Sequence, residues 1–121
     1  MSEQSPSAPI APPISFEQFL AVDIRVGRVL SASLNPKARK PAYVLVIDFG
    51  PLGQRTTSAQ VTANYRPEEL VGRQVVAVCN FPPKNVAGVT SEVLVLAAVC
   101  PEQGTVLLSP DRPVSEGVRI L

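Results

Sequence analysis

The chain has 121 residues, which is enough for one domain with its own core and hardly enough for two. It carries 11 Lys and Arg residues against 10 Asp and Glu residues. The resulting formal net charge of +1 excludes a protein whose whole surface is strongly basic and binds nucleic acid, but it is compatible with a local basic patch. Because the chain contains no histidine, it has no Ser-His-Asp or Cys-His catalytic set, no imidazole base and no histidine metal ligand.

Residues 1–13 are rich in proline and small polar residues. Proline lacks the backbone N–H that helices and sheets require, so we expect a disordered or polyproline tail. The alternative is a proline-rich docking ligand. The folded domain is expected over residues 14–121. It should begin with a short helix, because Ser15 followed three residues later by Gln18 is typical of a capping box.

From residue 24 onward the pattern is typical of β-strands, most of them ended by proline. The predicted strands are residues 24–34, 42–49, 55–61, 74–81, 91–100 and 105–109. Between the third and fourth, residues 66–70 predict one helical turn, since Pro67 suits the first helical position. This order favours an all-β fold, an OB-fold (oligonucleotide/oligosaccharide-binding) Greek-key β-barrel of five to six strands with short helices. A β-sandwich is the alternative.

Several predicted strands are apolar on both faces, namely residues 43–47, 75–79 and 93–100. Along the strands of a small antiparallel barrel, apolar residues that face the core normally alternate with polar residues on the solvent-exposed outer face. Doubly apolar strands need a second cover, which the first helix and a second copy of the chain can supply. We therefore expect a homodimer, the alternative being a monomer with extra surface hydrophobicity.

The two cysteines, Cys79 and Cys100, lie in apolar runs and are expected to be small buried core residues. A disulfide or a reactive thiol is the alternative. The chain shows no secretory signal, and its longest apolar run, residues 93–100, is too short to cross a bilayer. We therefore expect a cytoplasmic protein without membrane insertion.

No catalytic or metal-binding set is visible among the scattered acids, so we expect a binding protein without enzyme activity, cofactor or metal. Lys37, Arg39 and Lys40 cluster in the predicted loop between the first two strands, which flanks the ligand face of an OB barrel. Further basic residues near neighbouring strands are Arg25, Arg28, Arg55 and Lys84. These cations could contact phosphates, or they could be solvated charges that keep an apolar protein soluble.

A second candidate site is the stiff loop at residues 80–85, where two prolines follow Phe81. If exposed, Phe81 would anchor an extended peptide; if it points inward, it belongs to the core. The sequence leaves both orientations open.

Six ordered motifs resemble the tRNA-binding domain family, over about residues 14–121. They are residues 19–27 (FLAVDIRVG), 38–43 (ARKPAY), 46–50 (VIDFG), 58–62 (SAQVT), 80–84 (NFPPK) and 107–113 (LLSPDRP). The resemblance implies an OB fold that dimerises through segments outside the barrel. It is strongest to members described as export-related chaperones, which implies unfolded preproteins and the translocation motor SecA as partners.

Under this chaperone interpretation, the expected peptide-binding residues are Arg39, Phe49, Phe81, Lys84, Ser91 and Glu92. The alternative is a tRNA-binding module that uses Arg25, Arg39, Lys40, Arg55, Asn80, Lys84 and Ser91. The tRNA-binding relatives carry a Ser-x-Gly-Met element after a glycine. Here residues 88–94 read GVTSEVL, so Ser91 is kept while Val93 and Leu94 replace the glycine and the methionine. A structural dimer without a ligand is the third interpretation.

Overall fold

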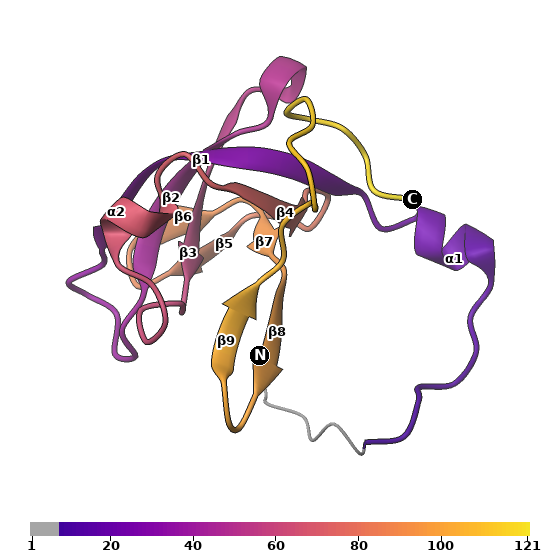
Figure 1. Cartoon of the computed structure of the whole chain (residues 1–121), viewed down its shortest axis with the longest axis horizontal. Coiled ribbons are helices and arrows are strands. Elements are labelled where there is room, and N and C mark those ends of the chain that lie inside the picture. The colour runs from indigo at the N-terminus through magenta and orange to yellow at the C-terminus, as the bar shows by residue number, and fades with distance from the viewer. Residues whose placement is uncertain (1–7) are drawn as a thin grey trace.

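The computed structural model describes residues 8–121 (Figure 1). Its helices are α1 (Phe16–Leu20), the 3₁₀ helix η1 (Gly50–Leu52) and α2 (Pro67–Leu70). Its strands are β1 (Ile24–Leu34), β2 (Tyr43–Asp48), β3 (Gln54–Ala59), β4 (Gln74–Val78), β5 (Lys84–Val86), β6 (Val89–Ser91), β7 (Leu94–Val95), β8 (Ala97–Cys100) and β9 (Gly104–Leu107). Residues 1–7 of the predicted tail lie outside the described residues, and residues 8–15 form no helix or strand.

Five strands form one antiparallel sheet in the order β3-β2-β1-β4-β7, which curls into a nearly closed barrel (Figure 1). The second half of β1 pairs with β2, and its first half pairs with β4. The register shifts between Val29 and Ser31, and such a bulge lets one long strand bend from one side of a barrel to the other. The predicted all-β barrel of the OB type is therefore confirmed.

The core lies inside this barrel. Along β2, Tyr43, Leu45 and Ile47 are buried and alternate with partly exposed residues, as expected of a strand with one face inward. β4 is buried along its whole length. The C-terminal segment, residues 110–121, hydrogen-bonds along the edge of β1 that β2 leaves free and also to the side chain of Gln74 on β4. The C-terminal segment thus closes an edge of the barrel next to β4.

The short helices follow their sequence signals. In α1, Gln18 N donates to Ser15 Oγ over 3.1 Å, and Ser15 N donates to Gln18 Oε1 over 2.8 Å, which confirms the capping box. α2 begins at Pro67, as predicted. No helix within residues 8–121 combines the length and the apolar character needed to span a bilayer.

Several strand boundaries differ from the predictions, and one hairpin was missed. The strand predicted over residues 74–81 ends at Val78, and the one over residues 91–100 is divided among β6, β7 and β8. The β5–β6 hairpin was not predicted, because Pro82 and Pro83 indicated only the end of a strand. Its turn places both Ala87 (φ 49°) and Gly88 (φ 83°) in the left-handed region, as two-residue hairpin turns require.

The burial expected for the cysteines also needs correction, since both thiols are free and partly exposed. Cys79 lies just beyond the end of β4, at the margin of the core. Cys100 ends β8 at the tip of a hairpin, where its Sγ lies 2.8 Å from Gln103 Oε1.

Candidate functional site

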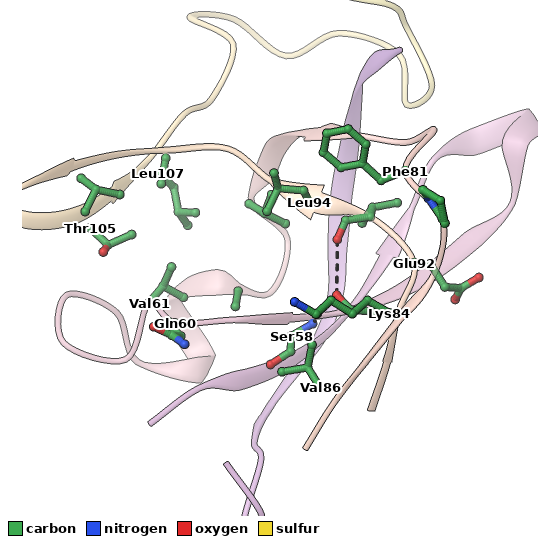
Figure 2. A pocket seen from close by; sticks show the side chains of 17 residues that line it. Ser58, Gln60, Val61, Phe81, Lys84, Val86, Glu92, Leu94, Thr105 and Leu107 are labelled. Atoms are coloured by element: carbon green, nitrogen blue, oxygen red, sulfur yellow. Dashed lines mark hydrogen bonds between the residues drawn. The ribbon is translucent and has the colours of Figure 1, made fainter. Parts of the chain in front are cut away.

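A groove of about 400 Å³ lies between the barrel and the β8–β9 hairpin (Figure 2). Its lining comes from β3, β5, β6, β7, β8 and β9 and from the loops beside them. Most of the lining side chains are apolar, and they include Val61, Val86, Val93, Leu94, Val95, Ala97, Val99 and Leu107. The groove therefore offers a mainly apolar surface, as ligand sites commonly do.

Phe81 lies at the rim of this groove and is 49% exposed, which decides the orientation that the sequence left open. β4 has ended at Val78, and the side chain of Asn80 is held by the backbone of Ala21 and Asp23. The chain therefore turns away from the core before it reaches Phe81. Lys84 lines the same rim (Figure 2).

Ser91 and Glu92 also line the groove, but their polar groups hold its wall together. Glu92 N donates to Thr56 O over 2.8 Å, and Thr56 N donates to a Glu92 carboxylate oxygen over 2.9 Å. The Ser91 and Thr57 hydroxyls lie 2.7 Å apart, and Thr57 Oγ1 donates to Val93 O over 2.6 Å. β3 is thus joined to residues 91–93 by side-chain hydrogen bonds and by one backbone bond.

A cluster of cations lies in the loop between β1 and β2, and one further cation, Lys84, lines the groove. Lys37, Arg39 and Lys40 are exposed in the loop between β1 and β2, and no ion pair to them or to Lys84 is found within residues 8–121. The side chain of Lys37 lies against Gly88, in the turn of the β5–β6 hairpin. Arg39 does not line the groove, although it was predicted at its rim.

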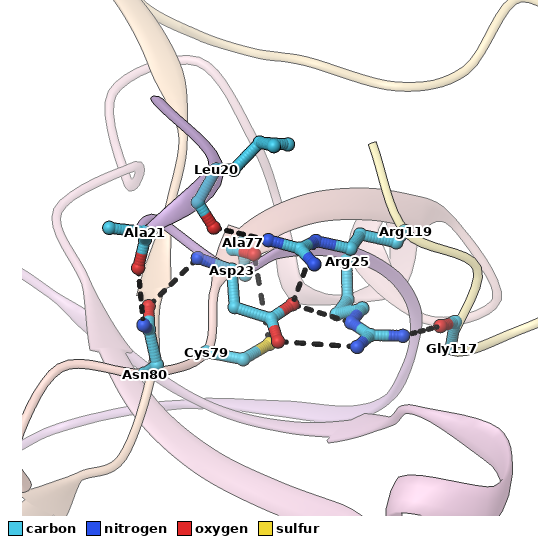
Figure 3. A network of polar contacts seen from close by, with 9 residues as sticks. All are labelled: Leu20, Ala21, Asp23, Arg25, Ala77, Cys79, Asn80, Gly117 and Arg119. Carbon is cyan, nitrogen blue, oxygen red and sulfur yellow. Dashed lines mark hydrogen bonds and ion pairs between the residues drawn. The ribbon is translucent and has the colours of Figure 1, made fainter. Parts of the chain in front are cut away.

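Arg25 lies in a different place, in a polar network around Asp23 (Figure 3), whereas Arg28 pairs with Glu116. Arg25 pairs with the Asp23 carboxylate at 2.5 Å and donates to Gly117 O over 3.1 Å. Asn80 Oδ1 accepts from Asp23 N, and Asn80 Nδ2 donates to Ala21 O. The hydrogen bond from Arg25 lowers the pKa of Asp23. Arg25 and Asn80, both predicted to bind tRNA, therefore connect α1, β1, the end of β4 and the C-terminal segment.

Beside this network is a smaller hollow of about 180 Å³, whose lining includes Arg25, Arg55 and Cys79. Burial, together with the charge of Asp23, raises the pKa of the Cys79 thiol, so little of it is thiolate at neutral pH. The structure thus places the predicted residues at two different sites, with Lys84 and Ser91, which belong to both predicted sets, at the groove. Phe81, Lys84, Ser91 and Glu92 gather at the groove, whereas Arg25 and Arg55 lie at the second hollow.

Phe49 does not line the groove, because its side chain is fully buried in the core, where it forms part of the floor of the smaller hollow. The expectation that it contributes to a peptide-binding rim or floor is therefore corrected. The ring packs directly against Gly27 of β1, where a Cβ atom would come within 2.7 Å of it. Glycine at this position leaves the space that the ring fills.

The contribution of the β8–β9 hairpin to the groove was not predicted from the sequence. Ala97, Val99, Thr105 and Leu107 lie at alternate positions of the two strands and line the groove with one face. The signal was the apolar run at residues 93–100, which has more apolar side chains than one core face can bury.

Residues 24–119 match the family described as "Putative tRNA binding domain". The structure of chaperone CsaA from Bacillus anthracis is 49% identical, with a TM-score of 0.86, and the match covers 91% of this chain and 100% of that one. CsaA from Picrophilus torridus is 44% identical, with a TM-score of 0.84, and the match covers 90% of this chain and 100% of that one.

Among curated proteins, a methionine–tRNA ligase from Porphyromonas gingivalis is 41% identical over 114 residues. The match covers 94% of this chain and 16% of that enzyme. The corresponding enzyme from Pyrococcus furiosus is 40% identical over 108 residues, with 88% of this chain and 14% of the enzyme covered. The chain thus spans about a sixth of the length of these curated relatives.

Proposed function

The chain belongs to the tRNA-binding domain family, and on this premise we propose that it is a non-catalytic holding chaperone that binds unfolded polypeptide segments in the groove. The observation that carries the proposal is the apolar lining of a groove of about 400 Å³ with the exposed ring of Phe81 at its rim. A groove of this kind buries apolar side chains with little regard for their order, which suits unfolded chains.

The mechanism is reversible burial. Each aliphatic side chain that leaves water contributes roughly 1.5–3 kcal/mol, part of which offsets the ordering of the bound chain. A few such contacts hold a segment at modest affinity and lower the concentration of free aggregation-prone chain, without ATP. The similarity to structures named chaperone CsaA supports this proposal.

The motif resemblance extends the proposal to export preproteins, bound by a homodimer in the cytoplasm before SecA-dependent secretion. Bacterial signal peptides have a basic end and an apolar middle. Lys84 at the rim has no anionic partner within the described residues, and the Glu92 carboxylate already accepts from Thr56 N. The groove is therefore better suited to the apolar middle than to the basic end.

A second candidate function is tRNA binding. The cations of the loop between β1 and β2 and Lys84 on β5 have no ion-pair partner within residues 8–121, so they are available to phosphates. The family match supports this alternative. The basic residues of the predicted tRNA set without an ion-pair partner within residues 8–121 are Arg39, Lys40, Arg55 and Lys84.

Salt dependence separates the two functions. We expect an unfolded export precursor to bind with an affinity that changes less than about threefold between 50 and 200 mM salt, because apolar burial is weakly screened. Any tRNA binding should weaken by about tenfold or more over this interval, since phosphate contacts release counterions. Salt-sensitive tRNA binding without precursor binding would leave a tRNA-binding module.

Substitutions in the groove and in the cationic loop test which of the two surfaces binds the precursor and which binds tRNA. Phe81→Ala should weaken precursor binding about tenfold, because the rim loses a large apolar contact. Val71→Ala, at a residue that is 50% exposed and lies outside the groove, is the matched control and should leave affinity unchanged. The double variant Arg39→Ala and Lys40→Ala should reduce any tRNA binding and spare the precursor. Equal losses in Phe81→Ala and Val71→Ala would contradict the groove assignment.

A further inference from the structure

The two outer edges of the β8–β9 hairpin differ in whether the rest of the molecule hydrogen-bonds to them. The hairpin forms a separate two-stranded sheet that projects from the barrel (Figure 1). Along β9, Leu107 N donates to the Tyr65 hydroxyl over 3.0 Å. Asn64 Nδ2 donates to Thr105 O and to Gln103 O, each over 2.8 Å. The outer edge of β9 is thus satisfied by two side chains from the loop before α2.

The outer edge of β8 has no such partner. Leu108 N donates to Leu96 O, and in an antiparallel ladder every second residue bonds to the partner strand. The backbone groups of residues 98 and 100 therefore bond to β9, and those of residues 97 and 99 point away from it. The N–H and C=O groups of Ala97 and Val99 therefore point outward. Within residues 8–121 no side chain or backbone group outside the hairpin bonds to them, and no other strand pairs with β8.

The faces of the hairpin suit a further apolar strand. The Ala97 and Val99 side chains line the groove. On the opposite face Ala98 pairs with Val106, and the side chain of Val106 is 40% exposed. A chain added beside β8 would place alternate side chains next to the groove, and its remaining side chains would also meet apolar neighbours.

We propose that the unfolded polypeptide binds as an added strand on β8, with its backbone hydrogen-bonded to Ala97 and Val99 and alternate apolar side chains in the groove. This inference rests on the proposed function and specifies its substrate class: extended, proline-poor segments with apolar residues at every second position. Backbone bonds supply affinity without regard to sequence, while the groove selects apolar side chains.

The test uses the full chain and a labelled nine-residue peptide that alternates Leu and Ser. Val99→Pro removes the outward N–H of β8 and leaves the ladder to β9 intact, because proline is tolerated where the N–H faces solvent. Val99→Thr keeps the N–H and the β-branched shape, and serves as the matched control. We expect Val99→Pro to weaken binding by about tenfold, and Val99→Thr by less than about threefold.

Amide hydrogen exchange provides a readout that does not depend on a variant. In the free protein the Ala97 and Val99 amides should exchange faster than that of Ala98, which is bonded to β9. Saturating peptide should slow the exchange of Ala97 and Val99 at least about tenfold. A second pair of peptides, N-methylated only at the Leu or only at the Ser positions, should differ in affinity, because only one set of amides faces β8.

The outcomes separate the two levels of the proposal. If the peptide binds but Val99→Pro binds it normally and the Ala97 and Val99 amides gain no protection, the added strand is wrong while the groove function stands. If the folded wild-type protein binds no unfolded polypeptide, both are wrong. If these amides become protected in the free protein as its concentration rises, a second copy occupies the edge and the inference is overturned.

Discussion

At the scale of single residues, Gly27 and Phe49 show how one contact assigns a side chain to the core. Phe49 follows β2 and has the size and aromatic character of a peptide anchor, as does Phe81. It is nevertheless fully buried, because β1 carries no side chain at position 27 and the ring fills that space. Phe81 lies after a strand that has already ended and stays at the rim of the groove.

Gly27→Ala should therefore destabilise the fold. The added methyl group would lie 2.5 Å from Ile47 Cγ2 and 2.7 Å from Phe49 Cε1, well inside van der Waals contact. We expect the free energy of unfolding to fall by about 1–3 kcal/mol in urea denaturation. Ser33→Ala, at an exposed position of the same strand, should change it by less than about 0.5 kcal/mol. Similar values for the two variants would show that the ring moves aside freely.

At the scale of elements, the contact between β3 and residues 91–93 depends on side-chain hydrogen bonds more than on a strand ladder. The sequence identified Ser91 and Glu92 as ligand contacts, and the structure gives their polar groups partners on Thr56 and Thr57. These bonds set the position of the groove wall. A wall held in this way can be altered by one substitution without unpairing a strand.

Glu92→Ala leaves Thr56 N without its acceptor and should lower the free energy of unfolding by about 1–2 kcal/mol. Glu92→Gln retains a side-chain oxygen and should stay within about 0.5 kcal/mol of the wild type. Chemical denaturation measures both, and peptide titration checks the groove. If Glu92→Gln weakened the binding of a basic peptide at unchanged stability, the carboxylate would be a ligand contact rather than a wall residue.

At the scale of the whole molecule, ion pairs connect the C-terminal segment to β1 and to the loop before it. Arg25 and Arg119 converge on Asp23 near the end of α1, and Arg28 pairs with Glu116 at 2.6 Å in the C-terminal segment. The bonds from Arg25 and Arg28 lower the pKa values of Asp23 and Glu116, respectively. The C-terminal segment is therefore held by charge as well as by its backbone bonds to β1.

These lowered pKa values predict acid sensitivity. Carboxylates with a folded-state pKa below the unfolded one add stability at neutral pH, which is lost as the pH falls below about 5 and through the folded-state pKa. The free energy of unfolding should decrease from pH 7 to pH 3. Asp23→Asn should lower the free energy of unfolding more at pH 7 than at pH 3. Glu102→Gln, at an exposed acid outside these pairs, should have the same small effect at both pH values. If the free energy of unfolding depended on pH in the same way for Asp23→Asn and the wild type, the Asp23 ion pair would not be the source of the acid sensitivity.

The sequence by itself determined the all-β class, the extent of β1, the capped helix α1 and the start of α2, because these follow from local signals such as strand periodicity, proline and a capping box. Only the tertiary structure decided which apolar faces line the groove and which residues are engaged. The Arg25 side chain donates a hydrogen bond to Gly117 O, 92 positions away in the sequence. Asp23 N donates one to Asn80 Oδ1, 57 positions away. Burial and hydrogen-bond partners depend on such distant contacts, which no local pattern encodes.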